Sequence, residues 1–190
     1  MAVHLTRIYT RTGDDGTTAL GDMSRARKTA LRVGAYGDTD ATNAAIGVAL
    51  AVGGPEIPDG VRALLGRVQN DLFDVGADLA TPISPNPKHP PLRITDAYVE
   101  RLEAACDEHN EALAKLNSFI LPGGTVGASL LHVARTSARA AERAAWALLE
   151  AEPDTTNPLT ARYLNRLSDL LFILARVANP GGDVLWKPGG

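Results

Sequence analysis

The chain has 190 residues, of which 45% are hydrophobic and 5% aromatic, and its net charge is −3. These values predict a single globular domain, residues 1–190, and exclude a global basic surface for nucleic acid. The one cysteine, Cys106, excludes an intramolecular disulfide framework and a multi-cysteine metal site.

No apolar run approaches the roughly 20 residues that a helix needs to cross a bilayer, so no membrane partner is expected. Residues 1–16, MAVHLTRIYTRTGDDG, lack the apolar core of a secretory signal. We therefore expect a cytoplasmic protein.

The first notable stretch is YTRTGDDGTTALGD, residues 9–22, which is polar and punctuated by glycine. Gly13 and Gly16 permit positive φ and a close approach of the backbone to a ligand, and successive N–H groups in such a loop can bind an anion. Hydroxyl donors are supplied by Thr10, Thr12, Thr17 and Thr18. The pattern GxxxxGK[ST] is absent, which argues against a P-loop nucleotidase.

Asp14 and Asp15 would repel phosphate unless a cation lay between these carboxylates and the phosphate. Arg11, Lys28 or a bound Mg²⁺ could supply that positive charge. The alternative is an ordinary turn, because Asp-Asp-Gly is a common turn sequence. Composition alone leaves both interpretations open.

Two amphipathic helices are predicted next. The first covers about residues 38–52, with Asp38 as N-cap and an apolar face that contains Ala41, Ala45, Val48, Ala49 and Val52. Asp40 and Asn43 share another face of this helix. The second covers about residues 60–80 after Asp59 and buries Val61, Leu64, Leu65, Val68, Leu72, Val75 and Leu79.

The proline-rich segment TPISPNPKHPPLR, from residue 81, cannot be helical and predicts an extended loop. A third helix follows Thr95 and Asp96, with an apolar face that extends to Leu113 and Leu116. The segment FILPGGT, residues 119–125, then predicts a tight turn at Gly123–Gly124. Phe119 in this segment is a candidate ligand contact, although core packing is the more common role of phenylalanine.

A fourth helix is predicted over residues 126–151. Its inner face contains Leu131, Ala134, Ala138, Ala141, Ala145 and Leu148. Another stripe contains His132, Arg135, Arg139, Glu142 and Arg143. Three arginines on an otherwise mostly apolar helix are suited to binding phosphate. One guanidinium group can donate to two phosphate oxygens at once. The alternative is a solvated face on which these charges are ordinary surface neighbours.

The fifth predicted helix covers residues 158–178. Its inward face contains Tyr163, Leu167, Leu170, Leu171 and Leu174, whereas Asn165, Asp169 and Arg176 lie off that face. No segment shows clear period-2 alternation, so the fold class is all-α, an up-down five-helix bundle with a long N-terminal loop. The four histidines have no zinc-pair spacing, and no hydrolytic nucleophile motif appears.

Five ordered blocks resemble the PduO-type ATP:cob(I)alamin adenosyltransferases. They are IYTRTGDDGTT, Lys28 with RVGAYGDTDATNAAIG, LFDVGADLATP, FILPGGT with ASLLHVARTSARAAER, and YLNRLSDLLFILAR. Together they span about 170 residues of the chain. One departure is that Ala41 and Thr42 follow Asp40, where the family has glutamate and leucine.

The resemblance implies a homotrimer of five-helix bundles with active sites between subunits. Such enzymes transfer the 5′-deoxyadenosyl group of ATP, with Mg²⁺, to cobalt of cob(I)alamin and release triphosphate. A reductase and an adenosylcobalamin-dependent enzyme are further partners. The resemblance implies no metal-ligating protein residue.

The resemblance also assigns roles to residues. The implied triphosphate-binding residues are Thr10, Arg11, Thr12, Gly13, Thr17, Thr18 and Lys28. Arg135, Arg139, Glu142 and Arg143 match the ATP-site helix, and Asn165 matches an asparagine near the nucleotide. Asp40 is expected to pair with Arg135 across the subunit boundary, and Phe119 to close the lower face of the corrin.

Three other functions remain possible on the sequence. The chain could be a nucleotide-binding sensor without catalysis, a purely structural helical bundle, or a carrier that hands adenosylcobalamin to another enzyme. ATP binding without adenosylcobalamin formation would indicate the sensor, and failure to bind ATP would indicate the structural bundle.

Overall fold

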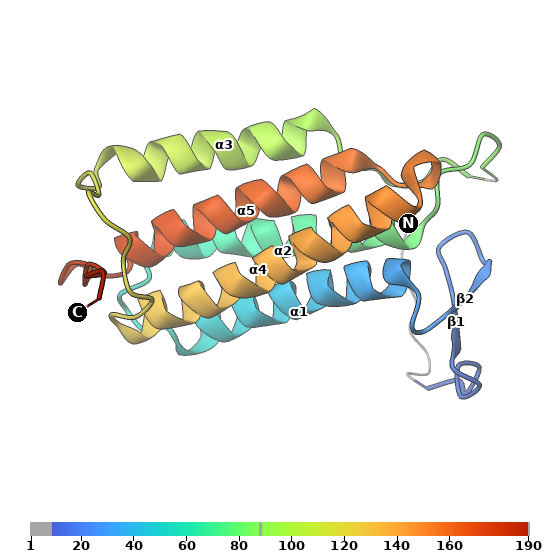
Figure 1. Cartoon of the computed structure of the whole chain (residues 1–190), viewed down its shortest axis with the longest axis horizontal. Coiled ribbons are helices and arrows are strands. Elements are labelled where there is room, and N and C mark those ends of the chain that lie inside the picture. Colours follow the sequence, from blue (N-terminus) through green and yellow to red (C-terminus); the bar gives the residue numbers. More distant parts are fainter. Residues whose placement is uncertain (1–8, 88, 190) are drawn as a thin grey trace.

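A computed structural model describes residues 9–87 and 89–189 of the chain (Figure 1). This part forms five α-helices, a short 3₁₀ helix and one β-hairpin. Their bounds are β1 Thr17–Ala19, β2 Arg25–Arg27, α1 Leu31–Val52, α2 Asp59–Ala80, α3 Asp96–Glu111, α4 Val126–Ala151, η1 Pro153–Thr155 and α5 Pro158–Val177. The predicted bundle of five helices is confirmed, with a small sheet added.

Successive helices run in opposite directions, which gives an up-down bundle. α1 packs against α2 and α4, α4 packs against α5, and α3 lies outside against α5. None of the helices in the described residues is long and apolar enough to cross a membrane.

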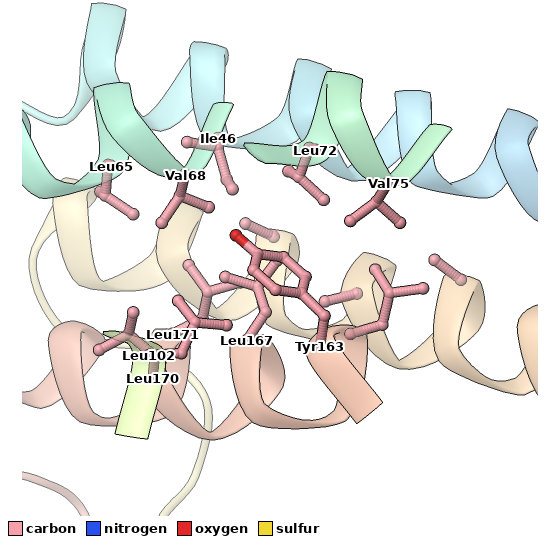
Figure 2. Close-up of a cluster of buried hydrophobic side chains, with 14 of the residues drawn as sticks. Ile46, Leu65, Val68, Leu72, Val75, Leu102, Tyr163, Leu167, Leu170 and Leu171 are labelled. Carbon is pink, nitrogen blue, oxygen red and sulfur yellow. The ribbon is translucent and has the colours of Figure 1, made fainter. Parts of the chain in front are cut away.

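The core lies between α1, α2, α4 and α5, as the close-up in Figure 2 shows for one part of it. The inner faces predicted for α4 and α5 are buried, because their apolar residues recur at helical spacing. Tyr163 is fully buried in this cluster, and its hydroxyl donates to Oδ2 of Asp71 at 3.2 Å. Burial and the adjacent Asp71 carboxylate raise the pKa of Tyr163 well above its usual value.

A buried polar network closes the end of the bundle where α2 and α4 finish. The side chain of Asp78 has no exposed surface and accepts from the Arg93 guanidinium. Its Oδ2 also accepts from the backbone N–H of Ile94 and from Nδ2 of Asn157, each at 2.7 Å. One carboxylate thus joins α2, the start of α3 and the N-cap of α5.

The hairpin was not predicted, because its strands have three residues each and show no apolar alternation. Local side-chain bonds form its turn instead: Oδ1 of Asp22 accepts from the N–H and hydroxyl of Ser24 at 2.9 and 2.6 Å. The N–H of Gly21 then donates to the carbonyl of Ala80 at 2.8 Å. The turn is therefore attached to the end of α2.

Two predicted helix boundaries were wrong. α1 begins at Leu31 with Ala30 as N-cap, so Asp38 lies within the helix. α3 ends at Glu111, so Leu113 and Leu116 belong to a loop. This loop is held by Nη2 of Arg176, which donates to the carbonyl of Ala114 at 2.8 Å.

The buried face predicted for α1 was also wrong in part. Ala41, Val48 and Val52 are exposed, whereas Thr39 and Thr42 are buried. Both threonine hydroxyls donate to carbonyls of the preceding turn, those of Ala35 and Asp38, at 2.9 Å. Because their hydrogen bonds are satisfied within the helix, these threonines can occupy the core face.

Replacing Asp78 tests the network at the end of the bundle. Asp78→Ala leaves the Arg93 charge and two further donors without their acceptor, and we expect it to lower the free energy of unfolding by about 3–5 kcal/mol. The measurement is urea unfolding at one fixed protein concentration. Arg162→Ala is the control, because it breaks only an exposed pair with Asp96 and should cost under about 1 kcal/mol. Equal losses would contradict the role of Asp78.

Candidate active site

The N-terminal loop is shaped by its own aspartate. Oδ1 of Asp15 accepts from the N–H and hydroxyl of Thr17 at 2.9 and 2.7 Å, and these bonds lower the pKa of Asp15. Gly16 has φ of +80°, a conformation that favours glycine. Nη2 of Arg25 donates to the carbonyl of Thr12 at 2.7 Å. Asp15 and Arg25 thus fix the loop, a role for Arg25 that the sequence had not indicated.

Lys28 lies beside this loop. A Cβ added at Gly13 would lie 2.9 Å from the carbonyl oxygen of Thr17 and 3.2 Å from Nζ of Lys28. The nearby backbone therefore favours glycine at this position, with the ammonium close by. The N–H of Lys28 also donates to the carbonyl of Gly16 at 2.9 Å. The hydroxyls of Thr10 and Thr12 lie 2.9 Å apart nearby. Gly13, Lys28 and the threonines are therefore brought together.

Arg11 and Thr18 lie at the edges of the same loop. Arg11 has φ of +62°, and its guanidinium is 5.7 Å from the ring centroid of Tyr9. Thr18 is in β1, opposite Ala26 in β2. All seven residues assigned to the triphosphate thus lie on one loop and hairpin at one end of the bundle (Figure 1).

The arginine stripe of α4 has no acidic partner in the described part of the chain. Among the described residues, no carboxylate oxygen lies within 4.0 Å of Arg135, Arg139 or Arg143. Glu142 faces the other way: its Oε1 accepts from Nδ2 of Asn165 on α5 at 3.0 Å. Glu142 is thus not paired with the arginines beside it. Arg139 and Arg143 are nevertheless exposed, so a solvated face stays an alternative interpretation of the stripe.

The stripe carries excess positive charge, with Arg135 partly buried and Arg139 and Arg143 exposed. Burial and the charge of Arg139 lower the pKa of Arg135. Nε of Arg135 donates to Nδ1 of His132 at 3.3 Å, and His132 is buried with its ring 6.2 Å from that of Phe172. Burial and Arg135 lower the pKa of His132, which keeps the imidazole neutral. An anion bound here would relieve the repulsion between the arginines.

Phe119 does not pack in the core, because 78% of it is exposed. Its backbone pairs with the C-terminal segment: the N–H of Trp186 donates to the Phe119 carbonyl at 2.7 Å, and that of Leu121 to the Val184 carbonyl at 2.8 Å. The Trp186 ring lies 6.1 Å from the Phe119 ring. Two aromatic rings therefore form one apolar surface.

Trp186 was not among the site residues predicted from the sequence. The one feature of the sequence that could have indicated Trp186 is its residue type. The chain has only two tryptophans, and this one lies in the segment DVLW near the C-terminus. Only the backbone pairing places it beside Phe119. The pairing joins residues more than sixty positions apart, which periodicity cannot detect.

Asp40 lies on α1 beside α2. It is exposed on α1 and borders a hollow of about 340 Å³ between α1 and α2. The exposed ring of Phe73 also borders this hollow. Within the described part of the chain, Asp40 forms no ion pair with Arg135 or with any other cation.

The N-terminal loop and Phe119 fall at two ends of the molecule, whereas the arginine stripe lies along the middle of α4. Figure 1 shows β1 and β2 at one end of the bundle, and the α3–α4 connection that contains Phe119 at the other. α4 runs between them and is about 39 Å long at 1.5 Å per residue. Within one chain, Phe119 is therefore far from the N-terminal loop.

Nothing in the described residues forms a protein cage for a metal ion. Within residues 9–87 and 89–189, no group of three His, Cys, Asp or Glu side chains is placed to bind one. Mg²⁺ commonly keeps several waters and uses substrate phosphates as ligands, so it needs no such cage.

The lowered pKa of His132 predicts that the stability of the folded chain depends on pH. This pKa is below the ordinary 6.5 in the folded chain, so below pH 6.5 the unfolded chain binds the additional proton and folding stability falls. We expect the free energy of unfolding to fall less between pH 7 and 5 in His132→Gln than in the parent chain. Urea unfolding at both pH values measures this, and identical falls would contradict a depressed pKa.

Comparisons with known proteins identify relatives of this chain. The family model described as cobalamin adenosyltransferase matches residues 8–178. The chain is 64% identical to a corrinoid adenosyltransferase of Mycobacterium tuberculosis, over 100% of this chain and 97% of that protein. It is 43% identical to a corrinoid adenosyltransferase of Bacillus subtilis, over 95% and 92%.

A solved structure is also similar. It is a phenylalanine-to-alanine variant of the PduO-type ATP:corrinoid adenosyltransferase from Lactobacillus reuteri, complexed with cobalamin and ATP. The TM-score is 0.87 at 34% identity, covering 95% of this chain and 99% of that one. On these matches the chain belongs to the cobalamin adenosyltransferase family.

Proposed function

We propose that this chain is a transferase that moves the 5′-deoxyadenosyl group of ATP to the cobalt of cob(I)alamin, producing adenosylcobalamin and triphosphate. The observation that carries this proposal is the arginine stripe of α4, with three guanidinium groups and no carboxylate partner among the described residues. The similar solved structure contains both ATP and cobalamin, which supports the same two substrates here.

The reaction needs electrostatic stabilisation more than proton transfer. Cobalt(I) supplies the electron pair that attacks C5′, the C5′–O bond breaks, and triphosphate leaves with the bonding electrons. Negative charge then grows on the leaving group, and Lys28, Arg139 and Arg143 are proposed to stabilise it. Mg²⁺ held by the phosphates would supply further positive charge.

The N-terminal loop is proposed to bind the triphosphate through its backbone and hydroxyl groups. The residues are Thr10, Arg11, Thr12, Gly13, Thr17 and Thr18. Asp15 and Arg25 already fold this loop, which reduces the ordering cost when ATP binds. Glu142 and Asn165, bonded to each other, are proposed to orient the nucleoside beside the stripe.

Phe119 is proposed to act on the corrin rather than on ATP. Making cobalt(I) from cobalt(II) is easier when the lower axial ligand is absent. An exposed aromatic ring against the lower face of the corrin would displace that ligand and keep water away. Trp186 supports the ring from the side and extends the apolar surface.

The site is proposed to form between subunits of a homotrimer. Two observations support this. The loop and Phe119 lie at opposite ends of the helical bundle. Neither Asp40 nor Arg135 has an ionic partner among the described residues. A neighbouring chain could bring Phe119 to the loop and pair Asp40 with Arg135. The small exposed residues of α1, such as Ala41 and Ala44, would allow close contact.

A reductase that supplies cobalt(I) and an enzyme that consumes adenosylcobalamin are proposed as further partners. A cytoplasmic location stays a prediction. A sensor that binds ATP without catalysis is distinguished from the enzyme by product formation.

The first test follows the visible spectrum of cobalamin with reductant, ATP and Mg²⁺. We expect ATP-dependent conversion to adenosylcobalamin by the parent chain. Phe119→Ala should slow conversion from cobalt(II) by at least about tenfold, with ATP affinity within about twofold, because the ring acts on the corrin. ATP binding without any product would indicate a sensor, and equal losses in ATP and corrinoid affinity would indicate a folding role for Phe119.

The second test mixes two impaired variants of the chain. Lys28→Ala and Phe119→Ala variants, unfolded together and refolded in equal amounts, should regain about one quarter of parental activity, because one interface in four then combines an intact loop with an intact ring. Each variant refolded alone is the control. Activity of the mixture no higher than the mean of the two controls would show that one chain supplies both groups.

A further inference from the structure

A second hollow lies at the Phe119 end of the bundle. It has a volume of about 500 Å³ and lies between the end of α3, the loop after it, the end of α5 and the C-terminal segment. Asn117, two residues before Phe119, lines it, and so does Leu185, which is paired with Ile120. The hollow and the Phe119 surface are therefore formed by the same two backbone segments, one that contains Asn117 and Phe119 and one that contains Leu185.

The walls of this hollow are fixed by a buried ion pair. Nε of Arg176 donates to Oδ2 of Asp183 at 2.8 Å, and the two side chains are only 8% and 15% exposed. Nη2 of Arg176 holds the carbonyl of Ala114 in the loop after α3. Three segments are thus tied together, and the hollow exists before any ligand binds.

The lining combines apolar and polar side chains. Leu113, Leu116, Val177 and Leu185 contribute the apolar surface. Arg176 and Asp183 neutralise one another, which leaves the Lys115 ammonium and the His109 imidazole. Neither of these lies within 4.0 Å of a carboxylate in the described residues. A ligand with a flat apolar group and one negative charge fits this lining.

The proposed reaction produces such a group. When Phe119 displaces the lower ligand of cobalamin, the displaced benzimidazole remains attached to the corrin through a ribose and a phosphodiester with one negative charge. We infer that this hollow receives the displaced nucleotide arm, with the base on the leucines and the phosphodiester near Lys115. This inference rests on the proposed function, because only a corrinoid bound at Phe119 presents the arm.

The consequence is a preference among corrinoids. Binding of the base in the hollow would oppose its return to cobalt, and would favour corrinoids that have a nucleotide arm. Cobinamide, which lacks the arm, should use the Phe119 surface without using the hollow. Lys115 would then be a specificity residue and not a catalytic one.

The test compares cob(II)alamin with cob(II)inamide, each titrated calorimetrically with the ATP-bound protein. We expect Lys115→Glu to weaken cob(II)alamin binding about tenfold, because it replaces attraction by repulsion near the phosphodiester, and to change cob(II)inamide binding by less than about twofold. Lys115→Arg keeps the charge and should restore cob(II)alamin affinity to within about threefold of the parent.

Arg67→Glu, an equal charge change at an exposed position of α2 outside the hollow, is the matched control and should affect neither corrinoid. If Lys115→Glu weakens both corrinoids equally, or weakens neither, the inference is overturned. Adenosylation of cobinamide by the parent chain is measured in parallel. Its presence would show that the proposed function holds even where the inference about the hollow fails.

Discussion

The close packing of α4 against α1 and α5 is the constraint on which the rest of the structure depends. The inner face of α4 consists of alanines and leucines that are fully buried, including Ala134, Ala138, Ala141 and Ala145. Small side chains allow neighbouring helices to approach closely, which fixes the rotation of α4 about its own axis. That rotation sets the arginine stripe at the bundle surface, where its charges remain accessible to an anion.

The arginine stripe is retained at a cost in stability. Arg135 lies in a partly buried position beside Arg139, and no carboxylate among the described residues compensates the pair. Elsewhere the fold does pair such groups: Arg32 donates to Oε2 of Glu152 at 2.6 Å, and Arg176 is paired with Asp183. The contrast supports a ligand role for the stripe, because uncompensated charge is typical of binding sites.

The two ends of the bundle have different tasks in the proposed mechanism. At one end, Asp15 and Arg25 fold the loop that is proposed to bind triphosphate. At the other end, the C-terminal segment supports Phe119 and, through Arg176 and Asp183, frames the neighbouring hollow. Because α4 separates the ends by about 39 Å, a subunit interface is the simplest way to unite them.

The sequence alone determined the helical core. The bounds of α4 and the inward faces of α4 and α5 follow from apolar residues at helical spacing, which is a local property. The stripe that contains Arg135 and Arg139 follows from the same periodicity. Membership of the family followed from ordered motifs along most of the chain, and the comparisons confirmed it.

Tertiary structure decided what depends on distant contacts or local side-chain bonds. The β1–β2 hairpin forms through Asp22 and its attachment to α2, and the buried face of α1 includes threonines that satisfy their own hydroxyls. Glu142 bonds to Asn165 rather than to an arginine. Phe119 is exposed and pairs with Trp186, far along the chain, because backbone pairing between remote segments leaves no periodic signal in the sequence.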